Sequence, residues 1–346
     1  MSNDAHKVAV VVMNLGGPDS PDAVEPFLFN LFFDPQIIRL PTPLRWLIAK
    51  IISRRRAPVA REIYAHLGGK SPLLAETEAQ ARALEAELAA RGRNARVFVA
   101  MRYWHPFTDE AAEAVRAFAP EEVVLLPLYP QFSTTTTQSS FMAWTKAARA
   151  FGLAVPTTGV CCYPTEPDFI AAHAALIMQT VEQADINREN ARVLFSAHGL
   201  PRKVVDGGDP YARQVEATAS AVVARLEWPD LDWRVTYQSR VGPLEWIGPD
   251  TEAEVAAAGR EGKAIVVVPI AFVSEHSETL VELDMEYRAV AETAGAPAYV
   301  RIPALGINKS FIAALANVVE AALERRRGDS WTCPAAAICF KDKTAV

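Results

Sequence analysis

The sequence contains no long uninterrupted apolar run. No stretch reaches the roughly 18 consecutive apolar residues that a membrane-spanning helix needs. The chain begins Met-Ser-Asn-Asp-Ala-His-Lys and then enters an apolar segment directly. This beginning lacks the order of charged start, apolar stretch and small-residue cleavage site that marks a signal peptide. We therefore expect a cytoplasmic protein.

Cysteine is scarce, with four residues in the whole chain: Cys161, Cys162, Cys333 and Cys339. The redox poise of the cytoplasm disfavours structural disulfides. We therefore expect these cysteines to be reduced thiols or metal ligands.

A surplus of positive charge is also missing. The chain has 41 Asp and Glu against 35 Lys and Arg, which gives a net charge of −6. General nucleic-acid-binding proteins usually carry a basic surplus or stripe, so we expect no nucleic-acid partner. Half of the residues are apolar and 22% are charged, as in an ordinary globular protein. A length of 346 residues exceeds the size at which one core usually keeps growing, so two domains are expected.

Short runs of apolar, often β-branched residues recur along the chain: Val8–Met13, Val97–Met101, Val123–Leu128, Val193–Phe195, Val235–Tyr237 and Ile265–Ile270. They show almost no polar alternation, which is typical of strands buried on both faces of a parallel sheet. Segments of helical character lie between them: Leu74–Arg91, Asp109–Phe118, Asp168–Gln183, Tyr211–Leu226 and Ser277–Ala294. This order predicts an α/β fold with right-handed crossovers.

The two halves of the chain resemble each other. Residues 11–18 match 194–201, residues 96–103 match 234–240, and residues 123–133 match 266–274. Each match is a strand-like run followed by a turn of polar or small residues. We predict two similar α/β domains at 1–155 and 156–325, followed by a tail at 326–346. Open α/β sheets bind ligands beyond the carboxyl ends of their strands, so we expect an active-site cleft between the domains.

A histidine, His198, directly follows one buried strand and precedes a glycine. Histidine changes protonation near neutral pH and ligates metals. A lone histidine at such a turn is more often structural, so the functional interpretation needs a second group.

Acidic residues supply that second group in the segment Ser274–Tyr287. If this segment is helical, Glu278, Glu282 and Glu286 stand one above another. Stacked carboxylates repel one another, so they either face water or serve a cation. Ferrous iron accepts carboxylate oxygen and imidazole nitrogen together. An exposed acidic helix face remains the alternative.

Two further segments are unusual. Thr134–Thr137 follows Phe132-Ser133 and could line an anion site at a helix N-terminus or simply cap the helix. Pro43–Arg56 reads as an amphipathic helix with Leu44, Leu47, Ile48, Ile51 and Ile52 on one stripe and a basic edge. That stripe could meet an anionic membrane or an apolar substrate, or pack on the core.

Seven motifs together resemble the ferrochelatases, and bacterial members in particular. They are Asn14–Pro18, Tyr64 with Gly68–Pro72, Met101–Pro106, Tyr129–Ser133, Ser196–Gly199, Gln238–Pro243 with Trp246, and Ser274–Tyr287. The resemblance runs from about residue 8 to residue 310. Each motif alone is weak, but their joint presence in this order is specific.

The resemblance implies a chelatase fold of two Rossmann-like domains, each with a parallel four-stranded sheet. It implies an enzyme that inserts ferrous iron into protoporphyrin IX to form protohaem, the terminal step of haem biosynthesis. His198 and Glu278 would be catalytic, and His198, Glu278, Glu282 and Glu286 would handle the metal. Residues implied to bind the porphyrin are Leu15, Tyr64, Ser71, Arg102, Tyr103, Tyr129, Trp246 and His276. The apolar stretch at about 27–56 would form a lip through which porphyrin passes from the membrane, and contact with the upstream porphyrinogen oxidase is expected.

The chemistry of the residues agrees with this resemblance. Metallation must remove two pyrrole protons and strip water from iron. A neutral histidine can accept a proton or contact the metal, and carboxylates can hold iron while its waters leave. A tight pocket can bend the ring, with the strain supplied by binding energy from the rest of the macrocycle.

Some members of this family carry a [2Fe–2S] cluster. Animal members place a cluster cysteine where this chain has Thr134, so the animal pattern does not apply. The four cysteines instead resemble bacterial members that draw ligands from the middle of the chain and from the tail. Four thiolates are the number that a cluster needs, although adjacent cysteines are awkward as joint ligands.

Three other functions stay open. A coproporphyrin ferrochelatase would need a more polar mouth for its extra carboxylates, and a cobalt chelatase for a sirohydrochlorin-type ring would need more basic groups. A two-domain protein could also bind metal or tetrapyrrole without catalysis.

Overall fold

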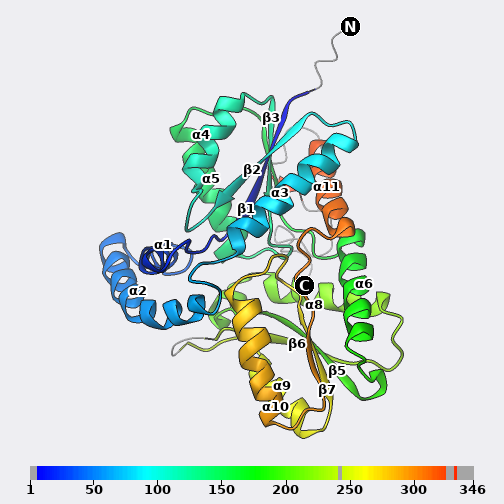
Figure 1. Ribbon diagram of the computed structural model, residues 1–346. Coiled ribbons are helices and arrows are strands. Elements are labelled where there is room, and N and C mark those ends of the chain that lie inside the picture. Colours follow the sequence, from blue (N-terminus) through cyan, green and yellow to red (C-terminus); the bar gives the residue numbers. More distant parts are fainter. Residues whose placement is uncertain (1–5, 241–243, 325–330, 333–346) are drawn as a thin grey trace. The chain divides into compact units, whose positions relative to one another are not determined.

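The computed structural model describes residues 6–240, 244–324 and 331–332. These residues form two compact units (Figure 1). The first unit contains the chain up to Cys162 and the segment that begins at Leu315, and the second contains Tyr163–Ala314. Each unit is built around its own parallel sheet.

The sheet of the first unit has the strand order β2-β1-β3-β4-β9, and every neighbouring pair is parallel. Its strands are β1 (Val8–Asn14), β2 (Ala95–Met101), β3 (Glu122–Pro127), β4 (Thr157–Val160) and β9 (Trp331–Thr332). Every residue of β1 is buried, because this central strand is covered on both faces.

The helices of the first unit are α1 (Val24–Phe32), α2 (Thr42–Ala65), α3 (Leu73–Ala90), α4 (Thr108–Phe118) and α5 (Ser139–Ala150), with a 3₁₀ turn at Pro21–Ala23 and a π-helical turn at Thr134–Gln138. Side chains of α4 and α5, such as Val115 and Trp144, share a core cluster with Val11 of β1. These two helices therefore cover the same face of the sheet. Helix α11 (Lys309–Glu324) contributes its C-terminal part to this unit.

The sheet of the second unit has the order β6-β5-β7-β8, again fully parallel. Its strands are β5 (Ala191–His198), β6 (Asp232–Gln238), β7 (Ala264–Pro269) and β8 (Tyr299–Arg301). Its helices are α6 (Pro167–Gln183), α7 (Arg202–Asp206), α8 (Tyr211–Arg225), α9 (Thr251–Arg260) and α10 (Tyr287–Thr293), with a 3₁₀ turn at Arg188–Asn190 and a π-helix at Glu278–Glu286.

The internal repeat predicted from the sequence is confirmed by the topology. In each unit the first strand is central, the second lies on one side and the third on the other, so β2-β1-β3-β4 matches β6-β5-β7-β8. The third strand of both units is followed by a π-helical segment and then an α-helix. The α/β prediction with two parallel four-stranded sheets is therefore confirmed, and the two-residue strand β9 is an addition to it.

The segment expected as one helix over Ser277–Ala294 differs from the expectation. It is a π-helix over Glu278–Glu286 and becomes α-helical only at α10. A π-helix closes its hydrogen bonds between residues five apart rather than four, so its turns are wider.

The helix expected at Pro43–Arg56 is longer than expected, and its buried face is different. Helix α2 lies beside α1 (Figure 1) and buries the small residues Ala49, Ser53 and Ala57. Small side chains let two helices approach closely, so the larger apolar residues point elsewhere. Leu47, for example, keeps 50% of its surface exposed. Among the helices of the described residues, none is long and apolar enough to cross a bilayer.

Candidate active site

His198 is the last residue of β5 and lies at the carboxyl edge of the second sheet. Its Nδ1 is 2.6 Å from the carbonyl oxygen of Gly199. A carbonyl can only accept a hydrogen bond, so Nδ1 carries a proton and donates it. The neutral ring then keeps its lone pair on Nε2, which can accept a proton or contact a metal.

Gly199 has little room for a side chain. A Cβ at this position would lie 3.1 Å from the backbone oxygen of Gln238 and 3.3 Å from the ring of Trp246. The glycine therefore lets the end of β6 and Trp246 approach the turn after His198. The rings of His198 and Trp246 have centroids 6.5 Å apart.

Glu278 begins the π-helix and lies between two imidazoles. Its Oε1 is 3.7 Å from Nε2 of His198, and its Oε2 is 3.6 Å from Nε2 of His276. Both separations are longer than a hydrogen bond. A cation bound between these atoms, or a proton transferred to one of them, would draw the carboxylate and the imidazole closer together. The side chains of His198 and Glu278 are about one-third exposed, at 39% and 32%. The two residues predicted to act together are thus brought together within one unit.

Glu282 lies one turn further along the π-helix and is held by hydrogen bonds. The backbone N–H of Ser239 and the hydroxyls of Ser239 and Tyr287 donate to its carboxylate at 2.9, 2.5 and 2.8 Å. Burial and the neighbouring charge of Glu278 nevertheless raise the pKa of Glu282, and these hydrogen bonds oppose that rise. Glu282 therefore stabilises the end of β6 against the helix, and it responds electrostatically to Glu278.

The metal set predicted from the sequence is only partly assembled. Glu278 and Glu282 interact, whereas Glu286 is exposed. In the part of the chain that the structure describes, no three His, Cys, Asp or Glu side chains form a group that could hold a metal ion. Coordination by all four predicted residues stays a prediction.

Most residues expected to bind porphyrin gather at the carboxyl edge of the first sheet. The backbone N–H groups of Arg102 and Tyr103 donate to the carbonyls of Asn14 and Leu15 at 2.9 Å each. Tyr129 follows β3 by two positions, and the N–H of its predecessor Leu128 donates to Met13. Burial raises the pKa of the Tyr129 hydroxyl, and Ser140 and Arg102 oppose that rise.

Asp34 organises this edge, although the sequence interpretation did not single it out. Its buried carboxylate accepts hydrogen bonds from the guanidinium of Arg102 at 2.8 Å and from the hydroxyl of Tyr103 at 2.8 Å. The hydroxyl of Ser139, at the start of α5, also donates to it. Tyr103 is fully buried, and burial together with Asp34 raises its pKa. A lone carboxylate at the end of the apolar run 27–33 was the sequence signal for this anchor.

Tyr64, on α2, and Ser71, in the connection between α2 and α3, lie near the same region. Tyr64 lies near the end of α2 and packs in a cluster with Phe27 and Tyr103. The N–H of Ser71 donates to the carbonyl of Pro18 at 2.7 Å. A Cβ on Gly17 would lie 2.4 Å from the Ser71 hydroxyl oxygen, so glycine is required for this contact.

The cysteines lie partly outside the described residues. Cys161 and Cys162 follow β4, are buried, and pack with Phe132. Cys333 and Cys339 belong to the segment that the structure does not describe.

Comparisons with known proteins agree on one family. The ferrochelatase family model matches residues 7–323. A ferrochelatase from Phenylobacterium zucineum is 57% identical over 336 residues, which cover 95% of this chain and 96% of the relative. A ferrochelatase from Caulobacter vibrioides is 56% identical over 336 residues and covers 95% of both chains. A ferrochelatase from Rickettsia bellii is 50% identical over 330 residues, which cover 95% of this chain and 91% of the relative.

Solved structures of chelatases share the fold. SirB from Bacillus subtilis with Fe³⁺ matches with a TM-score of 0.52 at 13% identity, over 92% of this chain and 96% of its own. The sirohydrochlorin chelatase SirB from Bacillus subtilis subspecies spizizenii, in complex with cobalt, matches with a TM-score of 0.53 at 10% identity, over 94% and 98%. At these identities the likeness concerns the fold alone. The family model and the relatives, which span nearly the whole chain, show that it belongs to the ferrochelatase family.

Proposed function

We propose that this protein inserts ferrous iron into protoporphyrin IX to form protohaem, the terminal step of haem biosynthesis. Family membership supports the reaction. The main structural support for the catalytic site is the pair His198 and Glu278, whose Nε2 and Oε1 atoms are 3.7 Å apart. The product is a metallated macrocycle and the enzyme is a lyase. Ferrous iron and porphyrin are its substrates.

His198 is the proton acceptor and a metal contact in this proposal. Its Nδ1–H is committed to the Gly199 carbonyl, so the available nitrogen is Nε2, which faces Glu278. Nε2 can contact iron only while it is unprotonated, so the two roles are taken in turn. After Nε2 takes a pyrrole proton, the imidazolium has the nearby Glu278 carboxylate as a counter-ion. That charge pair stabilises the protonated ring while the metal enters.

Glu278 is the partner of His198 and a second metal contact. Its carboxylate can hold iron while water leaves, because carboxylate oxygen is a ligand that ferrous iron accepts, and it lies 3.7 and 3.6 Å from Nε2 of the two flanking histidines. Glu282 and Glu286 continue the acidic row behind it as a relay. Burial and the charge of Glu278 raise the pKa of Glu282, so this carboxyl holds a proton more readily than an ordinary one, as a relay group must.

We further propose that the porphyrin is bound by Leu15, Tyr64, Ser71, Arg102, Tyr103, Tyr129, Trp246 and His276. The guanidinium of Arg102 supplies a positive charge suited to a propionate, although Asp34 already neutralises part of it. The hydroxyl of Tyr103 is bound to Asp34, so its contribution is to hold Arg102 and the strand end in place.

The substrate choice is supported by helix α2. Its exposed apolar residues favour protoporphyrin, which has only two carboxylates, over the more carboxylated coproporphyrin. Those residues are Leu44, Trp46, Leu47 and Ile51. Together with neighbouring arginines they also suit an anionic membrane surface, so we place the protein at the inner face of the cytoplasmic membrane. There it could receive protoporphyrin from the upstream porphyrinogen oxidase.

Anaerobic turnover assays test this function. The purified protein is mixed with ferrous iron and either protoporphyrin IX or coproporphyrin III, and metalloporphyrin formation is followed by absorbance. We expect a higher kcat/KM with protoporphyrin. Faster turnover of coproporphyrin would overturn the substrate assignment. Tight porphyrin binding without metallation would identify a carrier instead.

A [2Fe–2S] cluster held by Cys161, Cys162, Cys333 and Cys339 is a separate proposal. Strand β4 pairs with β9 so that Val160 lies opposite Thr332. In the sequence Cys161 follows Val160 and Cys333 follows Thr332. The buried thiols after β4 fit a cluster, which thiolates hold away from water. Visible absorption bands and stoichiometric sulfide in anaerobically purified protein are expected, and their loss in Cys161→Ser would support the ligand set. Protein with neither signal would end the proposal.

A further inference from the structure

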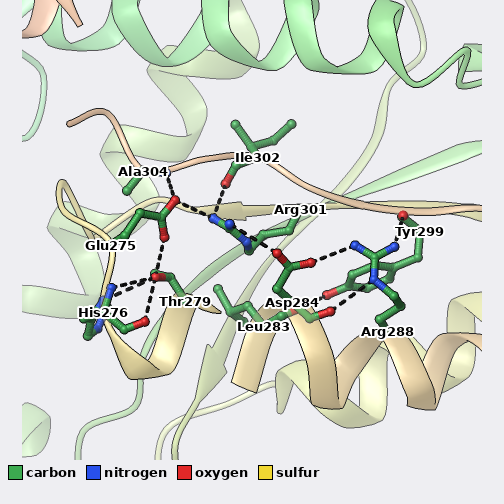
Figure 2. Close-up of polar contacts among 10 residues, drawn as sticks. All are labelled: Glu275, His276, Thr279, Leu283, Asp284, Arg288, Tyr299, Arg301, Ile302 and Ala304. Atoms are coloured by element: carbon green, nitrogen blue, oxygen red, sulfur yellow. Dashed lines mark hydrogen bonds and ion pairs between the residues drawn. The ribbon is translucent and has the colours of Figure 1, made fainter. Parts of the chain in front are cut away.

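Arg301 is a buried cation beside the π-helix. It ends the edge strand β8, and its side chain is only 8% exposed. One terminal nitrogen donates to Oε1 of Glu275 at 2.8 Å, and the other lies 3.3 Å from Oδ2 of Asp284 (Figure 2). These carboxylates lie on either side of Glu278, one before the π-helix and one within it. A buried guanidinium with two such partners fixes both of them, because its planar fork holds its donors in set directions.

The first of these bonds fixes the loop that leads into the helix. Glu275 also accepts hydrogen bonds from the N–H of Ala304 at 2.9 Å and from the hydroxyl of Thr279 at 2.5 Å. The same hydroxyl oxygen accepts the N–H of His276 at 3.0 Å. Arg301 therefore anchors the loop that presents His276 and the turn that presents Glu278.

The second bond fixes the helix one wide turn later. Asp284 is bound by Arg301 and by Arg288, whose Nη2 donates to it at 2.7 Å. The hydroxyl of Tyr299, on the same strand as Arg301, donates to the carbonyl of Leu283. Side chains of strand β8 thus bind the helix directly at Leu283 and Asp284 (Figure 2).

The spacing of these contacts suits a π-helix. Thr279, which is tied to Glu275, and Asp284 are five residues apart, and residues five apart are the hydrogen-bonded pair of a π turn. In an α-helix the same two residues would point about 140° apart, because each residue turns the chain by about 100°. An α-helical form would therefore turn Asp284 away from the side of Thr279, where Glu275 and Arg301 lie.

We propose that Arg301 is a positioning residue for metal insertion. By bridging Glu275 and Asp284 it holds Glu278–Glu286 in the π form, and that form places the Glu278 carboxylate opposite His198. This inference rests on the proposed function, and it assigns to Arg301 an effect on turnover that does not require contact with iron or porphyrin.

Arg301→Met and Arg301→Lys test the proposal, with Arg192→Met as a matched control. Arg192 is equally buried, at 5% side-chain exposure, and also bridges two carboxylates, Asp232 and Glu261. It lies at the beginning of β5, at the opposite edge of the sheet from His198. A loss caused only by removing a buried ion pair should appear in both proteins.

For Arg301→Met we expect kcat to fall roughly 10- to 100-fold, with KM for porphyrin changed less than about threefold, because misplaced catalytic groups slow the chemical step. Amide exchange should accelerate in residues 277–287 and stay unchanged in α9. Arg301→Lys keeps the charge but not the fork, and should show the same pattern in weaker form. Folded Arg192→Met should keep the parental kcat.

A parental kcat in folded Arg301→Met or Arg301→Lys would overturn the proposal. So would faster exchange spread over the whole second unit, or an equal loss of kcat in Arg192→Met. The exchange measurement does not need turnover. If the parent fails to metallate protoporphyrin, the proposed function fails while the local exchange pattern still decides whether Arg301 holds the π-helix.

Discussion

At the scale of single residues, the side chains that matter are defined by their hydrogen-bond partners. His198 has one nitrogen bound to a carbonyl and one facing a carboxylate, so its tautomer and its available lone pair follow from one contact. Glu282 and Asp34 each accept several hydrogen bonds and hold neighbouring strand ends in place. His173 differs from these residues, because the structure gives its ring no hydrogen-bond partner among the described residues.

His173 on α6 is fully buried, and both of its ring nitrogens lack a hydrogen-bond partner among the described residues. Burial lowers its pKa to about 3, against 6.5 for the ordinary side chain. As the pH falls below about 6.5, His173 takes up a proton in the unfolded chain but stays neutral in the folded chain. The free energy of unfolding therefore falls, by up to about 1.4 kcal/mol per pH unit.

We therefore predict that His173→Leu raises the free energy of unfolding, and raises it more at pH 5 than at pH 7.5. Urea denaturation of parent and variant at both pH values measures this. The same difference at the two pH values would contradict the assignment. His6→Leu is the control, because His6 is exposed and should show little effect at either pH.

At the scale of elements, sequence patterns predicted the strands better than the helical surfaces. The runs that became β1 and β7 are apolar at successive positions. This is the pattern expected of strands that are covered on both faces in a parallel sheet. The π-helix could not be predicted in this way, because its register depends on contacts with Arg301, fifteen positions after the helix ends. Alanine and serine carry little hydrophobic signal, so the buried face of α2 was also missed.

Helix α2 carries a prediction of its own. We expect the parent to bind vesicles containing anionic phosphatidylglycerol, and the triple variant Leu44→Ser/Leu47→Ser/Ile51→Ser to bind at least about tenfold more weakly, because each lost side chain removes apolar area from the interface. Vesicle sedimentation measures the bound fraction. Val59→Ser is the matched control, since Val59 is exposed on the same helix outside this stripe. Equal binding of parent and triple variant would remove the membrane assignment.

At the scale of the whole molecule, one topology occurs twice and carries different chemistry in each copy. The π-helical segment that follows the third strand is rich in threonine in the first unit and acidic in the second. The sequence matches 123–133 and 266–274 predicted this correspondence. Asp34 stood out in the sequence as a lone carboxylate after an apolar run, but its role could not be predicted, because its partners Arg102, just after β2, and Ser139 of α5 lie far along the chain. The domain limits at 155 and 325 and the full site set stay predictions.

The most direct test of the account is the rate of anaerobic iron insertion into protoporphyrin by His198→Ala and Glu278→Gln. His6→Ala and Glu292→Gln are the matched controls, because both residues are exposed and lie outside the candidate site. We predict a loss of roughly 100-fold or more for His198→Ala, about 10-fold or more for Glu278→Gln, and parental rates for the controls, with all four proteins folded. Near-parental turnover in both site variants would contradict the account.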